Sequence, residues 1–385
     1  MKYDNDIEKY INKLSAPNIG IIGLTGVGKS SLINKIFGTE IATTGAGKAV
    51  TTEYTKYSPS ASSGIDLPVN LYDSPGYEPG DKIQNFVEKT KKFLNEKNRL
   101  GEKEQIHLIW YLINASTARL TPADIEILAK INQNNIPAII VLSKSDIGGT
   151  TQKEELKRAI EETKFSKVYK IVEVAAKPLT FPNGKYIYEP FGMEELVAFT
   201  KELLPTIYLD GFIVSQIVDI ESKKELAWKH VRTASFACFG IGSAPIPGSA
   251  PTSLIAGLIY MYSRIIAIYG HTNIGLFLAI SGITLGGVIT VVTDGWLDLF
   301  SWAFPGISIL TGGAAAAFTA ASGIAFIDTC EELAIEELTG SESEIKQKIR
   351  KKYQEKFRNA SRLNIVISTP QDIDRVGTDF INKKI

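Results

Sequence analysis

The 385-residue sequence has few cysteines and no excess of either charge, and each shortage excludes a class of protein. The two cysteines, Cys238 and Cys330, both lie in apolar surroundings, which argues against a disulfide framework or a zinc site and favours a reducing compartment. Lysine plus arginine equal aspartate plus glutamate at 42 each, so the basic excess of a typical nucleic-acid-binding protein is missing. The first fourteen residues lack the apolar core of a signal peptide. We therefore expect a cytoplasmic protein for which nucleic acid is an unlikely partner.

Charge is scarcest between residues 231 and 330. Only five charged residues occur there: Arg232, Arg264, Asp294, Asp298 and Asp328. The uncharged runs 233–263, 265–293 and 299–327 each exceed the roughly 20 residues that cross a bilayer. Glycine and proline interrupt these runs, and such a density of small residues also suits helices packed closely in a soluble bundle. Membrane association and a soluble Ala/Gly-rich bundle both remain open, and in lipid Arg264 would need a partner such as Asp294 or Asp298.

The first half of the chain alternates apolar strand-length runs with helix-like segments. The expected strands are 18–23, 67–73, 106–114, 136–143 and 168–176, and the expected helices are 29–37, 80–102, 122–134, 151–163 and 192–204. This alternation predicts an α/β fold, with a mainly parallel sheet covered on both faces and one antiparallel edge strand before residue 61. We expect the following division: an N-terminal helix (1–16), the α/β domain (17–205), a connecting helix (206–230), a hydrophobic all-α domain (231–330) and a charged helical segment (331–385).

A phosphate-binding motif follows the first strand. "GLTGVGKS" (23–30) fits the pattern GxxxxGK[ST] and opens a helix, so its main-chain amides are expected to surround phosphate oxygens. Lys29 would reach the β and γ phosphates, and the Ser30 hydroxyl would bind Mg²⁺. In "LYDSPG", Asp73 ends the next parallel strand, where it could hold Mg²⁺ through water, and the Gly76 amide could contact the γ phosphate.

A base-recognition motif follows a later strand. In "SKSD", Asp146 would accept hydrogen bonds from the ring nitrogen and exocyclic amine of guanine, while the Lys144 stem packs on the base. In "VAAK", the Ala176 amide would meet the guanine carbonyl oxygen. Adenine lacks this donor pair, so these residues predict a guanine nucleotide.

In these motifs and in their order, residues 16–205 resemble the Era-like GTPases of the TRAFAC class, and "GLTGVGKSSLIN" with "VTTEYTKYSP" is similar to the immunity-related GTPases. The resemblance implies GTP or GDP as ligand, Mg²⁺ as cofactor, and hydrolysis of GTP. It implies that nucleotide is bound by Gly23, Thr25, Gly26, Val27, Gly28, Lys29, Ser30, Ser31, Ser143, Lys144, Asp146, Ala176 and Lys177. It implies that Lys29, Thr52 and Gly76 act in hydrolysis, and that Ser30, Thr52 and Asp73 hold the metal, with Thr51 the less favoured switch threonine.

Three positions depart from the family pattern. The base motif begins with Ser143 where relatives carry Asn or Thr, which predicts weaker affinity with an unchanged choice of base. Gly26 replaces the asparagine of potassium-activated relatives. Tyr77 follows Gly76 in place of a glutamine that could orient the attacking water. This departure predicts that hydrolysis is slow or is completed by a partner, and no catalytic base is assigned.

The region after residue 231 resembles an uncharacterised hydrophobic helical domain that follows some bacterial Era-like GTPases, through "IPGSAP", "YG" at 269–270 and "PGIS". We therefore expect a GTP-hydrolysing switch that controls a membrane-associated helical domain at the cytoplasmic face of a membrane. The alternative is a non-catalytic membrane effector or scaffold regulated by GTP. The expected partners are guanine nucleotide, membrane lipid, and a second copy or an activating protein.

Overall fold

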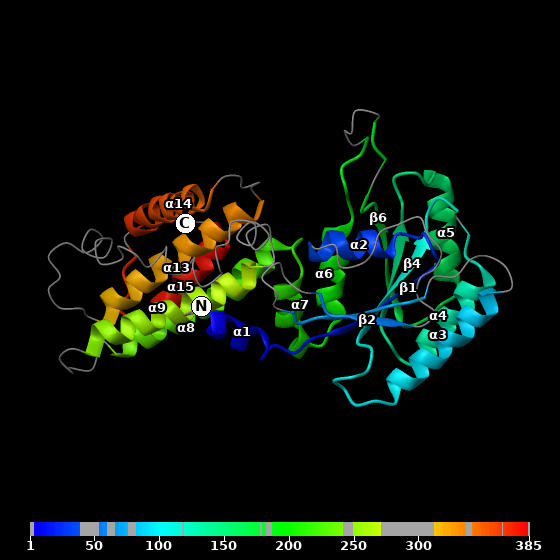
Figure 1. Ribbon diagram of the computed structural model, residues 1–385, viewed down its shortest axis with the longest axis horizontal. Helices are drawn as coiled ribbons and strands as arrows, with labels where there is room; N and C mark the ends of the chain where they lie inside the picture. Colours follow the sequence, from blue (N-terminus) through cyan, green and yellow to red (C-terminus); the bar gives the residue numbers. More distant parts are fainter. Residues whose placement is uncertain are drawn as a thin grey trace. The chain divides into compact units, whose positions relative to one another are not determined.

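The computed structural model describes residues 4–38, 54–59, 66–75, 82–117, 119–177, 179–181, 187–241, 249–270, 312–335, 341–363 and 365–383. They divide into two compact units (Figure 1). The α/β unit comprises the described residues between 14 and 219, and the helical unit comprises those of 4–13 and 220–383. The chain therefore leaves the helical unit after its first helix and returns to it at Ile220.

The α/β unit is built on a six-stranded sheet in the order β2-β3-β1-β4-β5-β6. The strands are β1 (Asn18–Gly23), β2 (Thr55–Tyr57), β3 (Asn70–Asp73), β4 (Leu108–Asn114), β5 (Ala138–Ser143) and β6 (Val168–Val174). All neighbours pair in parallel except β2, which runs antiparallel to β3 at the edge. The expected parallel sheet with one antiparallel edge strand is confirmed.

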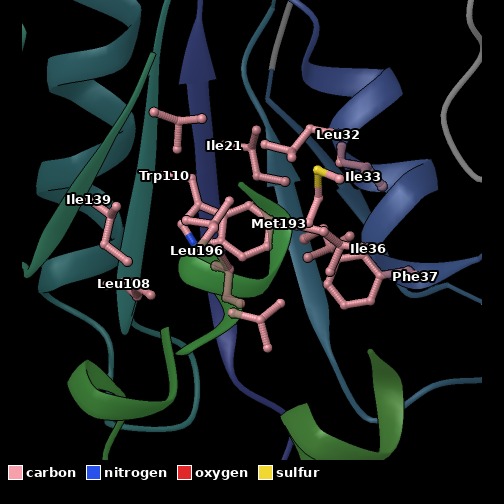
Figure 2. Packing of buried hydrophobic residues seen from close by; sticks show 14 of the residues in the cluster. Ile21, Leu32, Ile33, Ile36, Phe37, Leu108, Trp110, Ile139, Met193 and Leu196 are labelled. Carbon is pink, nitrogen blue, oxygen red and sulfur yellow. The ribbon is translucent and has the colours of Figure 1, made fainter. Parts of the chain in front are cut away.

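Helices cover both faces of this sheet because alternate strand residues point to opposite sides. One face carries α2 (Lys29–Phe37), α6 (Met193–Leu203) and α7 (Leu209–Ser215), and the other carries α3 (Lys82–Asn98), α4 (Pro122–Gln133) and α5 (Thr150–Glu162). A short 3-10 turn, Thr206–Tyr208, leads into α7. Figure 2 shows Trp110 of β4 between Ile21 and Leu196 on the first face. Its indole N–H donates to the buried Thr200 hydroxyl at 3.0 Å, so the ring fills the core without an unpaired polar atom.

The helical unit is organised around α13 (Gly312–Ile335). This helix packs against α8 (Ile220–Ile241), α9 (Ser249–Tyr269), α14 (Glu342–Arg362) and α15 (Pro370–Ile381). The backbones approach closely at Gly323, where a Cβ atom would lie 2.5 Å from the methyl carbons of Val231. Small residues therefore allow tight helix contacts here, as the sequence indicated. The predicted all-α C-terminal region is confirmed.

The N-terminal helix α1 (Asp4–Ile11) packs on α9. Arg264 of α9 donates to the Asp6 carbonyl oxygen at 2.8 Å, and its guanidinium lies over the rings of Tyr10 and Tyr260. The charge of Arg264 is thus stabilised by a main-chain oxygen and two aromatic faces. Its predicted partners, Asp294 and Asp298, lie outside the described residues.

One described helix, Gly312–Ala334 within α13, is long and apolar enough to cross a membrane by length and composition. In this structure 83 % of that apolar stretch is buried among other helices. Packing in a protein core accounts for such composition as well as a bilayer does, so the helix alone is weak evidence for membrane insertion.

Candidate functional site

The phosphate loop lies between β1, which ends at Gly23, and α2, which begins at Lys29. Gly26 and Gly28 have φ angles of +72° and +107°, a region that side chains with a Cβ atom rarely adopt. Nothing lies within 4 Å of a Cβ built at either position. The loop therefore faces open space with its main chain, and the start of α2 adds its unpaired amides and positive dipole end.

Lys29 lies under this loop and is only 8 % exposed. Its ammonium group donates to the Gly23 carbonyl oxygen at 2.9 Å and lies 4.0 Å from the Asp73 carboxylate. Burial lowers the pKa of Lys29, and the negative charge of Asp73 opposes that shift. A buried cation directly beneath open main-chain amides is suited to an anionic ligand such as a polyphosphate.

Asp73 is at the end of β3, paired with Ile21 of the neighbouring β1. Burial raises the pKa of Asp73 to about 6, while the Lys29 charge acts in the opposite direction. Its Oδ1 atom is buried and has no hydrogen-bond donor among the described residues. Such an atom is costly unless a ligand satisfies it.

These features fit Mg²⁺. A buried carboxylate oxygen without a donor can accept a hydrogen bond from metal-bound water, and Ser30 presents a hydroxyl in the first turn of α2. The predicted contributions of Thr52, of its alternative Thr51 and of Gly76 lie outside the described residues. The metal-binding roles of Ser30, Thr52 and Asp73 stay predictions.

The base motif follows β5 at the same edge of the sheet, because β1, β3, β5 and β6 are parallel and their carboxyl ends meet there. Lys144 is exposed and has a left-handed φ of +56°. Ser143 is buried, and its hydroxyl donates to the Ile113 carbonyl oxygen at 3.2 Å. That serine therefore ties β5 to β4. Asp146 is half-buried, and its Oδ2 accepts the Leu179 main-chain N–H at 3.0 Å.

The remaining predicted residues line the same edge of the sheet. In the loop before α2, Thr25 is exposed and Val27 is buried. Ser31 is half-buried in the first turn of α2. Ala176 is half-buried and Lys177 exposed just beyond β6. The structure thus places the phosphate loop, Asp73 and the base motif at one edge of one sheet, and their roles in nucleotide binding stay predictions.

Three further residues, Ser74, Lys153 and Glu173, support the loops of the site, and the sequence analysis assigned no role to them. The Ser74 hydroxyl exchanges hydrogen bonds with the main chain of Gly23 at 3.3 and 3.4 Å. Lys153 donates to the Ser145 carbonyl oxygen at 3.2 Å and to Glu173 at 2.5 Å. Burial alone would raise the pKa of Glu173, but hydrogen bonds from Lys153 and Lys157 lower it. These contacts hold the two loops to neighbouring strands, which only the tertiary structure shows.

The family that the chain matches is found within the α/β unit. Residues 18–144 match the model of a family described as 50S ribosome-binding GTPase. GTPase Era of Caldanaerobacter subterraneus subsp. tengcongensis is 28 % identical over 200 residues, which cover 51 % of this chain and 59 % of the relative. Neuronal-specific septin-3 of Homo sapiens is 26 % identical over 173 residues, which cover 38 % of this chain and 46 % of that protein. The match thus spans between 46 % and 59 % of the length of these two relatives.

Among solved structures, a variant of Aquifex aeolicus Era bound to GDP.AlF4- is 22 % identical. The similarity covers 58 % of this chain and 68 % of that one, with a TM-score of 0.36.

Proposed function

We propose that residues 18–144, which match a GTPase family model and are similar to GTPase Era, form a GTPase domain. In this proposal the chain binds GTP and GDP with Mg²⁺ and hydrolyses GTP as a molecular switch. The observation that carries the proposal is the pair of buried charges, Lys29 and Asp73, beneath a loop whose Gly26 and Gly28 face open space. Asp146 at the same sheet edge offers a carboxylate to a base. A buried cation, an orphaned carboxylate oxygen and open amides together match a magnesium-bound triphosphate.

The chemistry assigned to these residues is transfer of the γ phosphoryl group to water. Lys29 and the loop amides would stabilise the negative charge that spreads over the γ phosphate oxygens in the transition state. Mg²⁺ bound near Ser30 and Asp73 would neutralise further charge on the same phosphates. No residue is assigned to orient the attacking water, and Tyr77 occupies the position where a glutamine would stand. We therefore propose slow turnover that an activating protein or a second copy accelerates.

The α/β unit also offers a route by which nucleotide could affect the chain that leads to the helical unit. At the end of α2, the Ile36 carbonyl oxygen accepts the Ile217 main-chain N–H at 2.9 Å. Ile217 is three residues before the start of α8. Because α2 begins at the phosphate loop, a shift of this helix would act on residues 216–219. This supports the proposed coupling between nucleotide state and the helical unit.

Nucleotide titrations test the proposal. Calorimetry with Mg²⁺ is expected to detect GTP and GDP binding by the full chain, but no ATP binding at the same concentrations. Lys29→Ala should abolish binding, whereas Lys35→Ala, an exposed lysine on the same helix, should leave it unchanged. Asp146→Asn should shift the preference toward xanthine nucleotides, with the exposed Glu162→Gln as its charge-matched control. A well-folded chain that gives no heat with any guanine nucleotide would refute the proposal.

The alternative function is a membrane effector or scaffold in which bound nucleotide controls assembly of the protein and hydrolysis has no role. The replacement of a water-orienting glutamine by Tyr77 favours it. Turnover of GTP by the full chain, with and without liposomes, separates the two functions, because the scaffold predicts rates near zero in both conditions. Retention on carbonate-washed membranes tests the proposed membrane association at the cytoplasmic face, and full release would rule out insertion.

A further inference from the structure

The main chain of the base motif is held firmly by its neighbours. The Ser145 main-chain N–H donates to the Val174 carbonyl oxygen at 3.2 Å, which joins the motif to the end of β6. The Ser145 hydroxyl donates to the Leu142 carbonyl oxygen at 2.7 Å, and Lys153 binds the Ser145 carbonyl oxygen. These contacts fix the backbone next to Asp146. They do not fix its side chain, which still rotates about two bonds.

The contact that reaches the Asp146 carboxylate comes from a segment 33 residues later in the chain. The Leu179 main-chain N–H donates to Asp146 Oδ2 at 3.0 Å. Leu179 follows the "VAAK" sequence, in which Ala176 is the predicted partner of the guanine carbonyl oxygen. The two ends of the predicted base pocket are therefore joined to each other through one hydrogen bond to a charged acceptor.

The segment that carries Leu179 is itself anchored. The Leu179 carbonyl oxygen accepts the Ile187 N–H at 2.9 Å, and Ala175 and Phe191 exchange two main-chain hydrogen bonds at 3.1 and 3.3 Å. The next residue, Gly192, has a φ of +86°, and a Cβ there would lie 1.9 Å from the Glu173 carbonyl oxygen. The described ends of the segment are thus fixed to β6, which sets the position of the Leu179 amide.

We propose that the main-chain amide of Leu179 positions the Asp146 carboxylate for the base and thereby sets the preference for guanine over hypoxanthine. This inference rests on the proposed binding of guanine nucleotides. A carboxylate has about four acceptor positions on its two oxygens, so Oδ2 can accept from Leu179 while acceptor positions remain on both oxygens for the base. Holding one oxygen removes rotational freedom that binding would otherwise have to restrict. Leu179 is a positioning residue through its main chain alone.

The Leu179 side chain offers a matched pair of variants. It is 49 % exposed, so it lies outside the core, and Leu179→Ala shortens it while keeping the amide donor. Leu179→Pro removes the N–H, because proline has no amide hydrogen. A comparison of these two variants isolates the hydrogen bond from the side chain.

Calorimetry of the full chain with Mg²⁺ and either GDP or IDP tests the proposal. Hypoxanthine lacks the exocyclic amine of guanine, so a misplaced carboxylate should harm GDP binding more than IDP binding. Leu179→Pro is expected to weaken GDP binding about tenfold, the size of one hydrogen bond to a charged group, and to lower the GDP-to-IDP affinity ratio. Leu179→Ala should leave both affinities within about twofold, well inside the energy of one such bond. Equal affinities for Leu179→Pro and Leu179→Ala would overturn the proposal.

A double-variant cycle separates positioning from a general structural effect. In the Asp146→Ala background, Leu179→Pro should cause no further loss, because its effect passes through the carboxylate. An equal loss in both backgrounds would mean that the proline merely distorts the segment, and the proposal would fail.

Hydrogen exchange gives a test that needs no proline. The Leu179 amide should be protected in the wild type and in Asp146→Asn, which keeps an acceptor oxygen, and should lose protection in Asp146→Ala. Unchanged protection in Asp146→Ala overturns the inference while leaving the proposed function intact. Absence of any guanine nucleotide binding by the wild type removes both.

Discussion

The Lys29 ammonium group and the Asp73 carboxylate lie 4.0 Å apart beneath the phosphate loop, and both are largely buried. Burial disfavours the charge on each group, and each charge partly offsets the cost of the other. Burial of the two charges costs desolvation free energy in the ligand-free chain. A bound phosphate would offset the cost at Lys29, and a bound metal ion would offset the cost at Asp73. This relationship leads to a prediction about proton binding.

Lys29→Ala should raise the pKa of Asp73 above its value of about 6 in the nucleotide-free chain, because the lysine charge opposes the effect of burial. A ¹³C NMR titration of the carboxyl group, assigned with Asp73→Asn, measures this pKa. Lys35→Ala serves as the control because its side chain is exposed on the same helix. A value near 4 in the wild type, or no change in Lys29→Ala, would contradict the prediction.

The same pKa has a consequence for stability. Since the folded chain holds the Asp73 proton more tightly than the unfolded chain, this carboxyl lowers the free energy of unfolding as pH rises from about 4 to about 6. The loss should remain constant above that window. Bound Mg²⁺ and nucleotide should remove the effect, because they favour the ionised carboxylate.

Gly28→Ala should abolish nucleotide binding while the chain stays folded. The φ of +107° makes any Cβ unfavourable by about 1–2 kcal/mol, and the added methyl group would point into open space where phosphate is expected. Gly101→Ala is the control, because its Cβ also meets open space but lies far along the sequence from the loop. Calorimetry with GDP and circular dichroism should together show lost binding with retained structure. Normal GDP affinity in Gly28→Ala would argue that the loop does not surround phosphate.

Much of the α/β unit could be predicted because its signals are local. The phosphate loop follows a buried strand, and the structure places β1 at Asn18–Gly23 and α2 at Lys29–Phe37, as the sequence predicted. The expected strand 67–73 is shorter, with β3 at Asn70–Asp73. Just before it, the Val69 main-chain N–H donates to the Leu67 carbonyl oxygen at 2.8 Å, which is a local hydrogen bond within the same segment. Boundaries shift in this way where hydrogen bonding to a neighbour decides the end of a strand.

The supporting contacts of the site could not be predicted, because they join residues far apart in the chain. Leu179 donates to Asp146 through its main-chain N–H. Every residue except proline has this group, so the residue type at position 179 does not reveal the contact. Ser74 binds Gly23, 51 residues away, with a hydroxyl that is common in loops. Similarly, the low charge of residues 231–330 indicated helices, but only the tertiary structure shows that α13 packs against four other helices. Apolar periodicity alone does not distinguish a buried helix from a membrane span.

Gln216→Leu should weaken the proposed coupling between the two units. Gln216 is fully buried, and its Oε1 accepts the main-chain N–H groups of Val218 and Asp219, both at 2.7 Å. Leucine would remove the acceptor that these two amides share, at a cost of about 2 kcal/mol or more. We expect GDP affinity to change little, while the difference in hydrogen exchange of α8 between GTP and GDP states disappears. Gln133→Leu, at an exposed position, is the control, and a retained difference in Gln216→Leu would exclude this route.

Gly323→Leu should distinguish a packed helical unit from a lipid-exposed span. In the structure, a Cβ atom at Gly323 would lie 2.5 Å from Val231 and 3.0 Å from the Met261 sulfur, so a leucine cannot fit between α13, α8 and α9. Overpacking of this kind costs about 1–3 kcal/mol or more, and thermal unfolding should shift accordingly. Gly240→Leu is the control, because that glycine is exposed on α8 and a Cβ there meets nothing within 4 Å. In lipid, acyl chains are as apolar as leucine and can yield, so a lipid-facing Gly323 would tolerate the change as well as Gly240 does. Equal stability of the two variants would therefore mean that α13 leaves its present neighbours, and that membrane insertion is the better account of its apolar sequence.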